Sequence, residues 1–341
     1  MKSSHIKLIG FAIFLIAFVG TGCGKKGGGS SGITVDLIEA TTEVPAKVRL
    51  FFQVDLGEST TFRALNESDF EIYENNLLIS KIESQAKVQN ETGSYLFSSI
   101  LLLDLSGSVL NGDALPRVKD ATVNYIENVM PNSTDSNYGA REMAVFWFDG
   151  EENIHSLIPF TVDRNAIIDS IRAITPEISL DNSTNLNGAV IQGLFELESR
   201  ISERNLDPRL STAGMLLIFS DGADQAGRAT QSAAISAVES LSNQYSVFTI
   251  GMGSEIDERF LTRIGRNGYE LAVNSFDLNQ AFIDASRNVE ETSESYVVLE
   301  YCSPKRSGDH KIELRAVVDD KVGRLITEFN ATGFTGGCII N

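Results

Sequence analysis

The chain of 341 residues is strongly acidic, with 28 lysines and arginines against 46 aspartates and glutamates and a formal net charge of −18. This balance argues against a nucleic-acid partner, because phosphate binding requires clustered cations. The composition is that of a globular protein, and the length allows one large or two modest domains.

The N-terminal residues have the layout of an export signal followed by a linker. Lys2 and Lys7 give a weak positive charge, and the apolar run at 8–19 is shorter than the roughly 20 residues of a membrane span. We therefore expect residues 1–22 to be a signal peptide and residues 23–32, rich in Gly and Ser, to be a flexible linker. An ordinary cleaved signal with an incidental cysteine at position 23 is the alternative.

This layout resembles a bacterial lipoprotein signal, in which the cysteine becomes the lipidated first residue of the mature chain. The resemblance implies that Cys23 carries lipid and that the protein is anchored in the bacterial cell envelope. Gly24, where Asp would favour retention in the inner membrane, favours the outer membrane, on its periplasmic face or at the cell surface. Gly20 departs from the usual pattern, which has Leu three residues before the cysteine.

Residues 33–97 show the period-two alternation of half-buried antiparallel strands. We predict strands at Lys47–Val54, Phe70–Glu74 and Ile79–Ile82, and no convincing helix.

Residues 98–292 alternate between short apolar runs and amphipathic stretches. The predicted strands are Ile100–Leu103, Met143–Phe148, Met215–Phe219, Val247–Ile250 and Tyr269–Val273, and the predicted helices are Leu115–Met130, Arg164–Ile174, Asn187–Ile201, Ala229–Leu241, Glu258–Ile264 and Leu278–Val289. This order predicts an α/β fold with a doubly wound, mostly parallel sheet and helices on both faces. The segment His155–Val162 follows a turn and contains Pro159, so it predicts an antiparallel edge strand.

Residues 293–341 return to strand alternation, at Ser295–Tyr301 and His310–Val318. Neither flank is long enough for a comfortable sandwich alone. We expect residues 293–341 to pair with residues 33–97 in one β-sandwich-like region; two separate β pieces are the alternative. If Cys23 carries lipid, Cys302 and Cys338 remain as an even pair, and an oxidising compartment favours a disulfide over two free thiols.

Polar oxygen donors follow two of the predicted central strands and precede a helix. Asp104, Ser106 and Ser108 end one strand, Asp221 follows another, and Thr184 lies in a polar loop directly before a helix. Loops at the carboxyl ends of parallel strands meet at one edge of the sheet. Hard oxygen donors there suit a hard divalent cation such as Mg²⁺.

This constellation resembles the von Willebrand factor A domain and its metal-ion-dependent adhesion site, over roughly residues 98–292. The resemblance implies that Ser106 and Ser108 bind the metal directly, Thr184 directly or through water, and Asp104 and Asp221 mainly through water. Mg²⁺ is the implied ion, with Mn²⁺ or Ca²⁺ as alternatives. An open coordination position would accept a carboxylate from a partner protein.

Other polar and aromatic residues are less informative. Asp149 follows a strand but favours a turn rather than a metal ligand, and Asp224 is either a ligand contact or a solvated charge. Trp147 is expected in the core. His155 and His310 lie in unrelated segments, so a zinc site is not expected.

These patterns favour a metal-dependent binding protein of the bacterial envelope that is not an enzyme. A structural module of envelope assembly, with a metal that serves only stability, is one alternative. A metal-assisted hydrolase is another, but no Gly-x-Ser-x-Gly elbow between a predicted strand and helix, His-Glu-x-x-His pair or second carboxylate cluster supports it.

Overall fold

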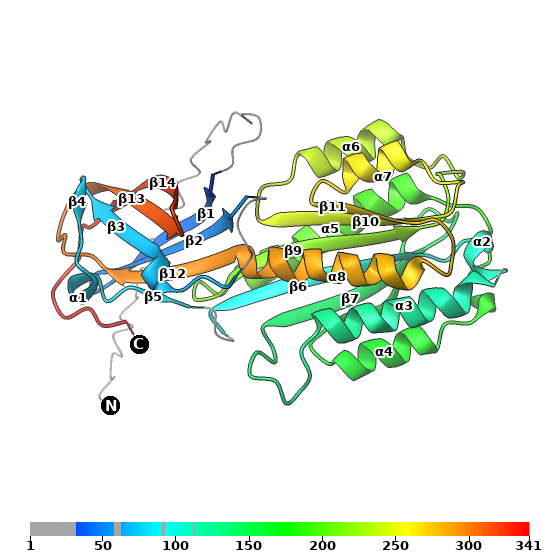
Figure 1. Cartoon of the computed structure of the whole chain (residues 1–341), viewed down its shortest axis with the longest axis horizontal. Coiled ribbons are helices and arrows are strands. Elements are labelled where there is room, and N and C mark those ends of the chain that lie inside the picture. The colour runs from blue at the N-terminus through cyan, green and yellow to red at the C-terminus, as the bar shows by residue number, and fades with distance from the viewer. Residues whose placement is uncertain (1–31, 58–62, 90–92, 112, 341) are drawn as a thin grey trace, which may run out of the picture.

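The computed structural model describes residues 32–57, 63–89, 93–111 and 113–340. The predicted signal peptide and Cys23 lie outside these residues. Two lobes lie end to end along the long axis (Figure 1). We call residues 95–295 the α/β lobe, and the described residues before 90 and after 295 the β lobe.

The α/β lobe is built on a six-stranded sheet with the order β11-β10-β9-β6-β7-β8. β8 pairs antiparallel with β7, and the other neighbours pair parallel. Pro159 is tolerated in β8 because that strand lies at the edge of the sheet. The strands are β6 (Tyr95–Asp104), β7 (Arg141–Phe148), β8 (His155–Thr161), β9 (Ser211–Ser220), β10 (Tyr245–Met252) and β11 (Gly268–Ala272).

Helices cover both faces of this sheet because its central strand is apolar on both sides. All ten residues of β6 are buried, and Leu101 and Leu102 point into different cores. One face packs against α3 (Ala114–Val129), α4 (Arg164–Arg172) and α8 (Leu278–Ser295), and the other against α5 (Leu186–Arg204), α6 (Gln231–Glu239) and α7 (Glu258–Ile264). The predicted α/β fold class is confirmed.

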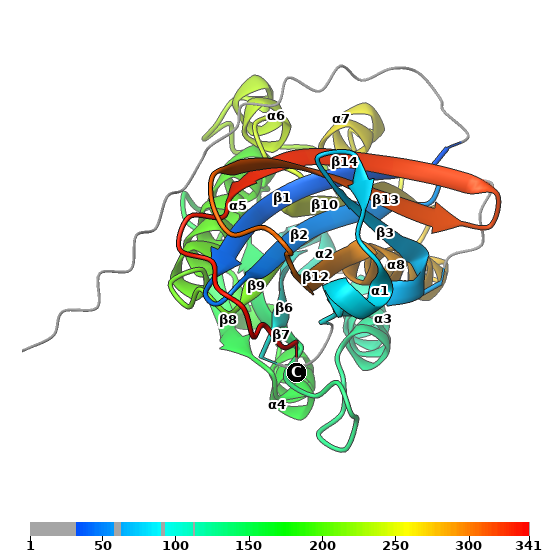
Figure 2. The same cartoon turned by 90° about the vertical axis from the view of Figure 1, so that its left-hand side faces the viewer.

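The β lobe consists of two antiparallel sheets with a shared core, seen face on in Figure 2. Both sheets join strands from the two ends of the sequence, since β12 pairs with β2 and β13 pairs with β3. One sheet contains β1 (Thr34–Glu43), β2 (Lys47–Asp55), β12 (Tyr296–Cys302) and β5 (Lys87–Val88), and the other β14 (Lys321–Asn330), β13 (Asp309–Val318), β3 (Phe70–Glu74) and β4 (Leu77–Leu78).

The strand predicted at Ile79–Ile82 is wrong. Ile79 is buried, but Ile82 is 90% exposed, so these residues do not share a strand face. The Ser80 side chain accepts a hydrogen bond from the backbone N–H of Glu83 and starts a single helical turn, α1 (Lys81–Ser84). The local cap therefore overrides the apolar alternation.

A disulfide joins Cys302, at the end of β12, to Cys338 in the C-terminal segment. The predicted pairing is confirmed. None of the helices in the described ranges combines the length and the apolar character that crossing a membrane requires.

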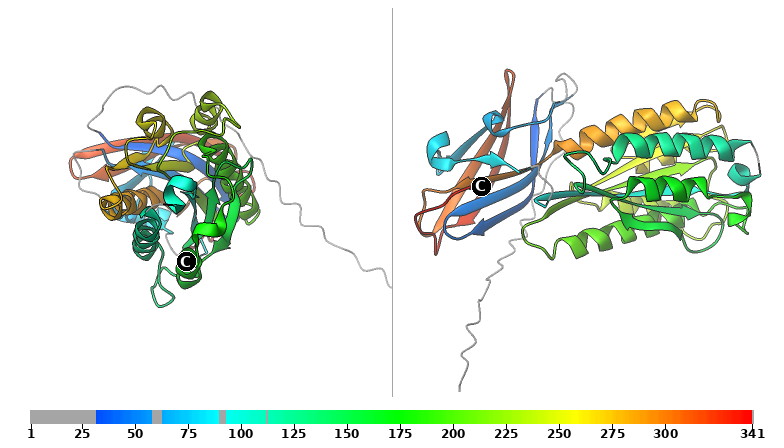
Figure 3. Two further views of the ribbon diagram at one scale, coloured as in Figure 1. Left: turned by 90° about the vertical axis from the view of Figure 1, so that its right-hand side faces the viewer. Right: turned by 90° about the horizontal axis from the view of Figure 1, so that it is seen from below.

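Figure 3 (right) shows from below how the two lobes meet. Aromatic and charged side chains form the junction. Tyr296 lies within 6.0–6.4 Å, between ring centroids, of Phe51, Tyr95 and Phe97. Arg49 on β2 donates hydrogen bonds to Glu300 and to the hydroxyl of Ser211, at the start of β9. Helix α8 passes directly into β12, without an intervening loop.

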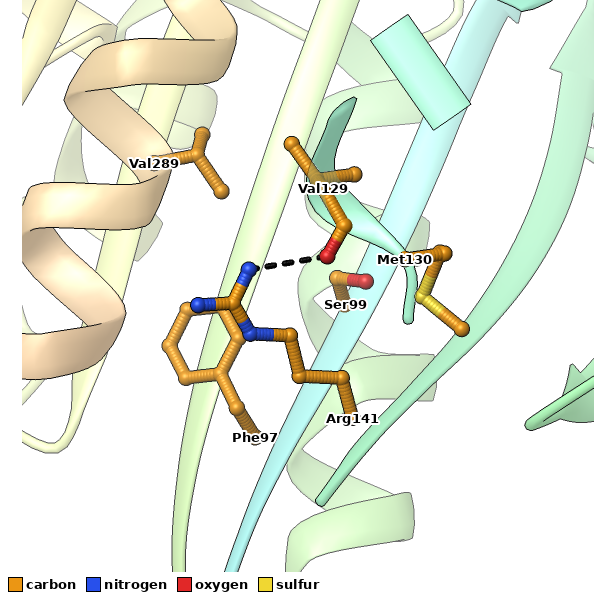
Figure 4. Close-up of a pocket in the computed structure, with 6 residues that line it drawn as sticks. All are labelled: Phe97, Ser99, Val129, Met130, Arg141 and Val289. Carbon is orange, nitrogen blue, oxygen red and sulfur yellow. Dashed lines mark hydrogen bonds between the residues drawn. The ribbon is translucent and has the colours of Figure 1, made fainter. Parts of the chain in front are cut away.

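A small cavity of about 10 Å³ lies beside the junction (Figure 4). Arg141 closes it by donating to the carbonyl oxygen of Val129 at 2.8 Å and to the hydroxyl of Ser293 at 2.7 Å. That volume holds about one water molecule. The cavity is therefore too small to bind a ligand.

Candidate metal centre

The predicted oxygen donors gather at the carboxyl edge of the sheet, at the end of the molecule remote from the β lobe (Figure 1). Asp104 is the last residue of β6, and the short helix α2 (Gly107–Leu110) begins directly after Ser106. Asp221 follows β9, and Thr184 precedes α5. The strand ends thus place three separate loops side by side.

Asp104 is the buried base of the cluster and has no solvent exposure. One carboxylate oxygen accepts the backbone N–H of Ser106 at 3.0 Å, and the other accepts the hydroxyl of Ser220 at 2.7 Å. Ser220 therefore orients Asp104 from the neighbouring strand. Ser220 was not among the predicted site residues, although its position directly before Asp221 could have indicated a role in the site.

Three further donors form a hydrogen-bonded chain beside Asp104. The hydroxyl oxygens of Ser106 and Ser108 lie 3.3 Å apart, and the hydroxyl of Ser108 donates to Asp221 at 2.9 Å. Neighbouring ligands on an octahedral Mg²⁺ ion with bonds of about 2.1 Å are about 3 Å apart. The donor type of these three side chains, and the spacing of the Ser106 and Ser108 hydroxyls, therefore fit Mg²⁺.

Thr184 is buried and faces the turn that contains Asp221. Its carbonyl oxygen accepts the N–H groups of Gln225 and Ala226, which ties its loop to the loop after β9. A Cβ atom at Gly222 would lie 3.8 Å from the Thr184 hydroxyl oxygen. The structure thus brings all five predicted donors to one region.

Gly107 allows the loops to approach each other closely. Its N–H donates to the carbonyl oxygen of Asn182 at 3.1 Å, and a Cβ atom at position 107 would lie only 2.7 Å from Asn182 Cβ. A larger residue would push the loop of Ser106 and Ser108 away from the loop of Thr184.

Burial disfavours the ionised form of both carboxyl groups of the cluster. Burial raises the pKa of Asp104 above its ordinary value. Burial, followed by repulsion from Asp104, raises the pKa of Asp221 to about 7. In the described part of the chain, no lysine or arginine forms an ion pair with either group. A divalent cation would supply the missing positive charge.

An open depression adjoins the cluster, so a second molecule can reach it. Besides Ser108 and Asp221, it is lined by the loops after β10 and β11 and by the start of α3: Asp113, Ala114, Met252, Gly253, Ser254, Glu255, Val273, Asn274 and Ser275. Next to it, Arg117 stacks on the exposed ring of Phe276 at 3.6 Å.

The remaining polar candidates lie outside the Asp104 cluster and accept hydrogen bonds from backbone N–H groups. Asp224 accepts the N–H of Asn187 at 2.9 Å and that of Gly227 at 2.9 Å, so it holds its own loop and the start of α5. Asp149 accepts the N–H of Glu151 at 2.8 Å in a turn after β7. Trp147 is buried, as predicted.

Residues 99–223 match the family model described as von Willebrand factor type A domain. The matched range contains all five donors. A curated relative, human inter-alpha-trypsin inhibitor heavy chain H4, is 20% identical over 262 residues, which cover 71% of this chain. The chain spans about a quarter, 27%, of the length of that protein.

Two solved structures are among those that match this chain. A von Willebrand factor type A protein from Catenulispora acidiphila has a TM-score of 0.45 at 10% identity and covers 89% of this chain and 74% of its own. Proximal thread matrix protein 1 from the mussel byssus, solved with a zinc-occupied MIDAS motif, has a TM-score of 0.43 at 12% identity and covers 64% of this chain and 49% of its own. Residues 99–223 of this chain are thus similar to the von Willebrand factor type A domain.

Proposed function

We propose that this protein is a Mg²⁺-dependent binding protein that captures an acidic group of a partner protein at the Asp104 cluster. The observation that carries the proposal is the chain of oxygen atoms from Ser106 through Ser108 to Asp221, open to an adjacent depression. Ser106, Ser108 and Thr184 would contribute hydroxyl oxygens, and Asp104 and Asp221 would act mainly through water. Mn²⁺ or Ca²⁺ could replace Mg²⁺ in such an oxygen site.

Neutral hydroxyl ligands would leave the bound ion with most of its positive charge. A partner's carboxylate could then complete the coordination sphere and neutralise it. Binding rather than catalysis is inferred because, among the described residues, no imidazole forms a hydrogen bond with the serines of the cluster.

We further propose that the protein is a lipoprotein of the bacterial envelope, anchored through Cys23 and placed at the outer membrane. The support is the apolar run and the small residues before Cys23, followed by a Gly-rich stretch. Incorporation of labelled fatty acid into the wild type but not into Cys23→Ser is the expected result. Equal labelling of both proteins would rule out the anchor.

The metal proposal is tested with two serines that line the same depression. We expect Ser108→Ala to weaken Mg²⁺ binding by about 10- to 100-fold, as lost metal-site contacts commonly do. Ser254→Ala should leave it unchanged, because Ser254 lies outside the donor set. Calorimetric Mg²⁺ titration and capture from envelope extract, in Mg²⁺ and in EDTA, give the two readouts.

The possible outcomes separate the candidate functions. Unchanged Mg²⁺ binding in both Ser108→Ala and Asp104→Ala would refute the metal site. If EDTA lowers only the melting temperature and no captured protein depends on Ser108, the metal serves stability and the structural-module alternative holds.

A further inference from the structure

A second group of side chains that could hold a metal lies in the β7–β8 hairpin, next to the Thr184 loop, since the Asn185 N–H donates to the Asp149 carbonyl oxygen at 2.7 Å. Asp149 follows β7, Glu151 lies in the turn, and His155 begins β8. One ligand atom from each of these residues lies within 4.8 Å of the other two. The hairpin creates this proximity, because it folds His155 back onto Trp147, its partner across the strands.

The His155 side chain is partly buried, with 31% of it exposed, and its Nε2 faces Glu151. Nε2 is shielded from solvent and has no hydrogen-bond partner among the described residues. It lies 3.2 Å from a carboxylate oxygen of Glu151, outside hydrogen-bond geometry. Neighbouring ligands on a tetrahedral Zn²⁺ ion with bonds of about 2.0–2.1 Å are separated by about this distance.

The surrounding contacts hold two of the three side chains in position. The ring of Trp147 stacks on that of His155 at 4.2 Å between centroids and 17° between planes. Asp149 is buried, and its carboxylate accepts the Ser179 hydroxyl at 2.5 Å and the Glu151 N–H at 2.8 Å. Oriented ligands of this kind are a common property of metal sites.

We propose that Asp149, Glu151 and His155 bind a borderline dication of the Zn²⁺ class. The imidazole nitrogen distinguishes this site from the all-oxygen Asp104 cluster, because imidazole suits Zn²⁺ whereas Mg²⁺ prefers oxygen. The side chain of Glu151 is 48% exposed, so water can reach the ion and fill its remaining coordination position. The proposal does not depend on the function proposed for the Asp104 cluster.

The test uses the single tryptophan of the chain, Trp147, as a reporter beside the proposed ligand His155. The full-length protein is titrated with Zn²⁺ in excess Mg²⁺, which favours occupation of the oxygen site by Mg²⁺. We expect Zn²⁺ to change Trp147 fluorescence until the change saturates. Equilibrium dialysis should show one bound Zn²⁺ per chain whose binding depends on Glu151.

Glu151→Gln and Glu152→Gln form a matched pair, since both remove one carboxylate from the same turn and leave the Trp147–His155 stack in place. We expect Glu151→Gln to weaken Zn²⁺ binding at least about 10- to 100-fold and Glu152→Gln to leave it unchanged. Zn²⁺ bound at Cys23 or at the Asp104 cluster would be equal in the two variants. Equal Zn²⁺ affinity in both, or no fluorescence change in the wild type, would overturn the proposal and leave an ordinary Glu–His ion pair.

Discussion

At the scale of single residues, the chain buries carboxylates in two contrasting ways. Glu142 is 1% exposed, and its oxygens accept hydrogen bonds from Arg200, Arg204 and Ser98 at 2.7–2.8 Å. Burial alone would raise its pKa, but the two guanidinium groups and the hydroxyl outweigh burial and lower it. Asp104 and Asp221 accept hydroxyl hydrogen bonds but have no guanidinium partner among the described residues, which is why a cation is expected there and not at Glu142.

Replacing Glu142 with Gln should lower the free energy of unfolding by about 3–5 kcal/mol, because two arginines lose their buried counter-charge. Chemical denaturation of the wild type and the variant measures the difference. Glu203→Gln is the control, since Glu203 pairs with Arg200 at the surface with 63% of its side chain exposed. A loss as large for Glu203→Gln would show that burial is not the cause.

The contribution of Glu142 to the free energy of unfolding should also depend on pH. Its pKa in the folded state lies below the ordinary value of 4.5, so the ionised form is favoured by folding. The stabilisation is therefore complete above pH 4.5 and is lost as the pH falls through the folded-state pKa. As the pH falls through this range, the free energy of unfolding of the wild type should approach that of Glu142→Gln. A constant difference in the free energy of unfolding between the two proteins would contradict the assignment.

At the scale of elements, the sequence predicted what depends on local pattern. Alternating strands and helices indicated the α/β sheet, and the rule that parallel strands end at one edge brought Asp104 and Asp221 together. The bond from Ser220 to Asp104 could not be predicted, because it depends on the register between β6 and β9.

The expectation against zinc rested on the two histidines alone, and the structure does not test it. That expectation weighed His155 only against His310, the other histidine beyond the signal segment. The proximity of His155 to Asp149 depends instead on the β7–β8 pairing, whose register shifts twice. Irregular pairing of this kind is set by packing across the sheet and leaves no periodic signal in the sequence.

The disulfide should stabilise the β lobe, because it ties the C-terminal segment to β12 across a sequence separation of 36 residues. Closing a loop of this length in the unfolded chain contributes about 3–4 kcal/mol. We expect reduction, or the pair Cys302→Ser and Cys338→Ser, to lower the denaturation midpoint. Reductant should not change the denaturation midpoint of the doubly substituted chain. A change in that midpoint would show that the effect of reductant does not come from the Cys302–Cys338 disulfide.

At the scale of the whole molecule, the junction binds the two lobes into one unit. Arg49 is 12% exposed and connects the lobes, since it donates to Glu300 on β12, to the carbonyl oxygen of Ser94 and to Ser211 on β9. The rings of Phe51, Tyr95 and Tyr296 pack beside it. We therefore expect the lobes to unfold together.

Arg49→Ala should separate the unfolding of the lobes into two transitions and lower stability by about 1.5–3 kcal/mol, the value of hydrogen bonds to a charged group. Differential scanning calorimetry measures both effects. Arg209→Ala removes an arginine whose side chain is 83% exposed and should leave a single transition. One unshifted transition in Arg49→Ala would show that the aromatic rings alone couple the lobes.

The direct passage of α8 into β12 has a mechanical consequence. The α/β lobe is inserted into the β lobe, so the chain crosses the junction twice, between β5 and β6 and from α8 to β12. A force applied to the edge near Asp104 would load both crossings at once, which restricts rotation of the lobe more than a single crossing would. Tension in α8 would pass into β12 along the axis of that strand. It would pull β12 lengthwise against β2, and all the paired positions from Tyr296 to Cys302 would oppose this shear together.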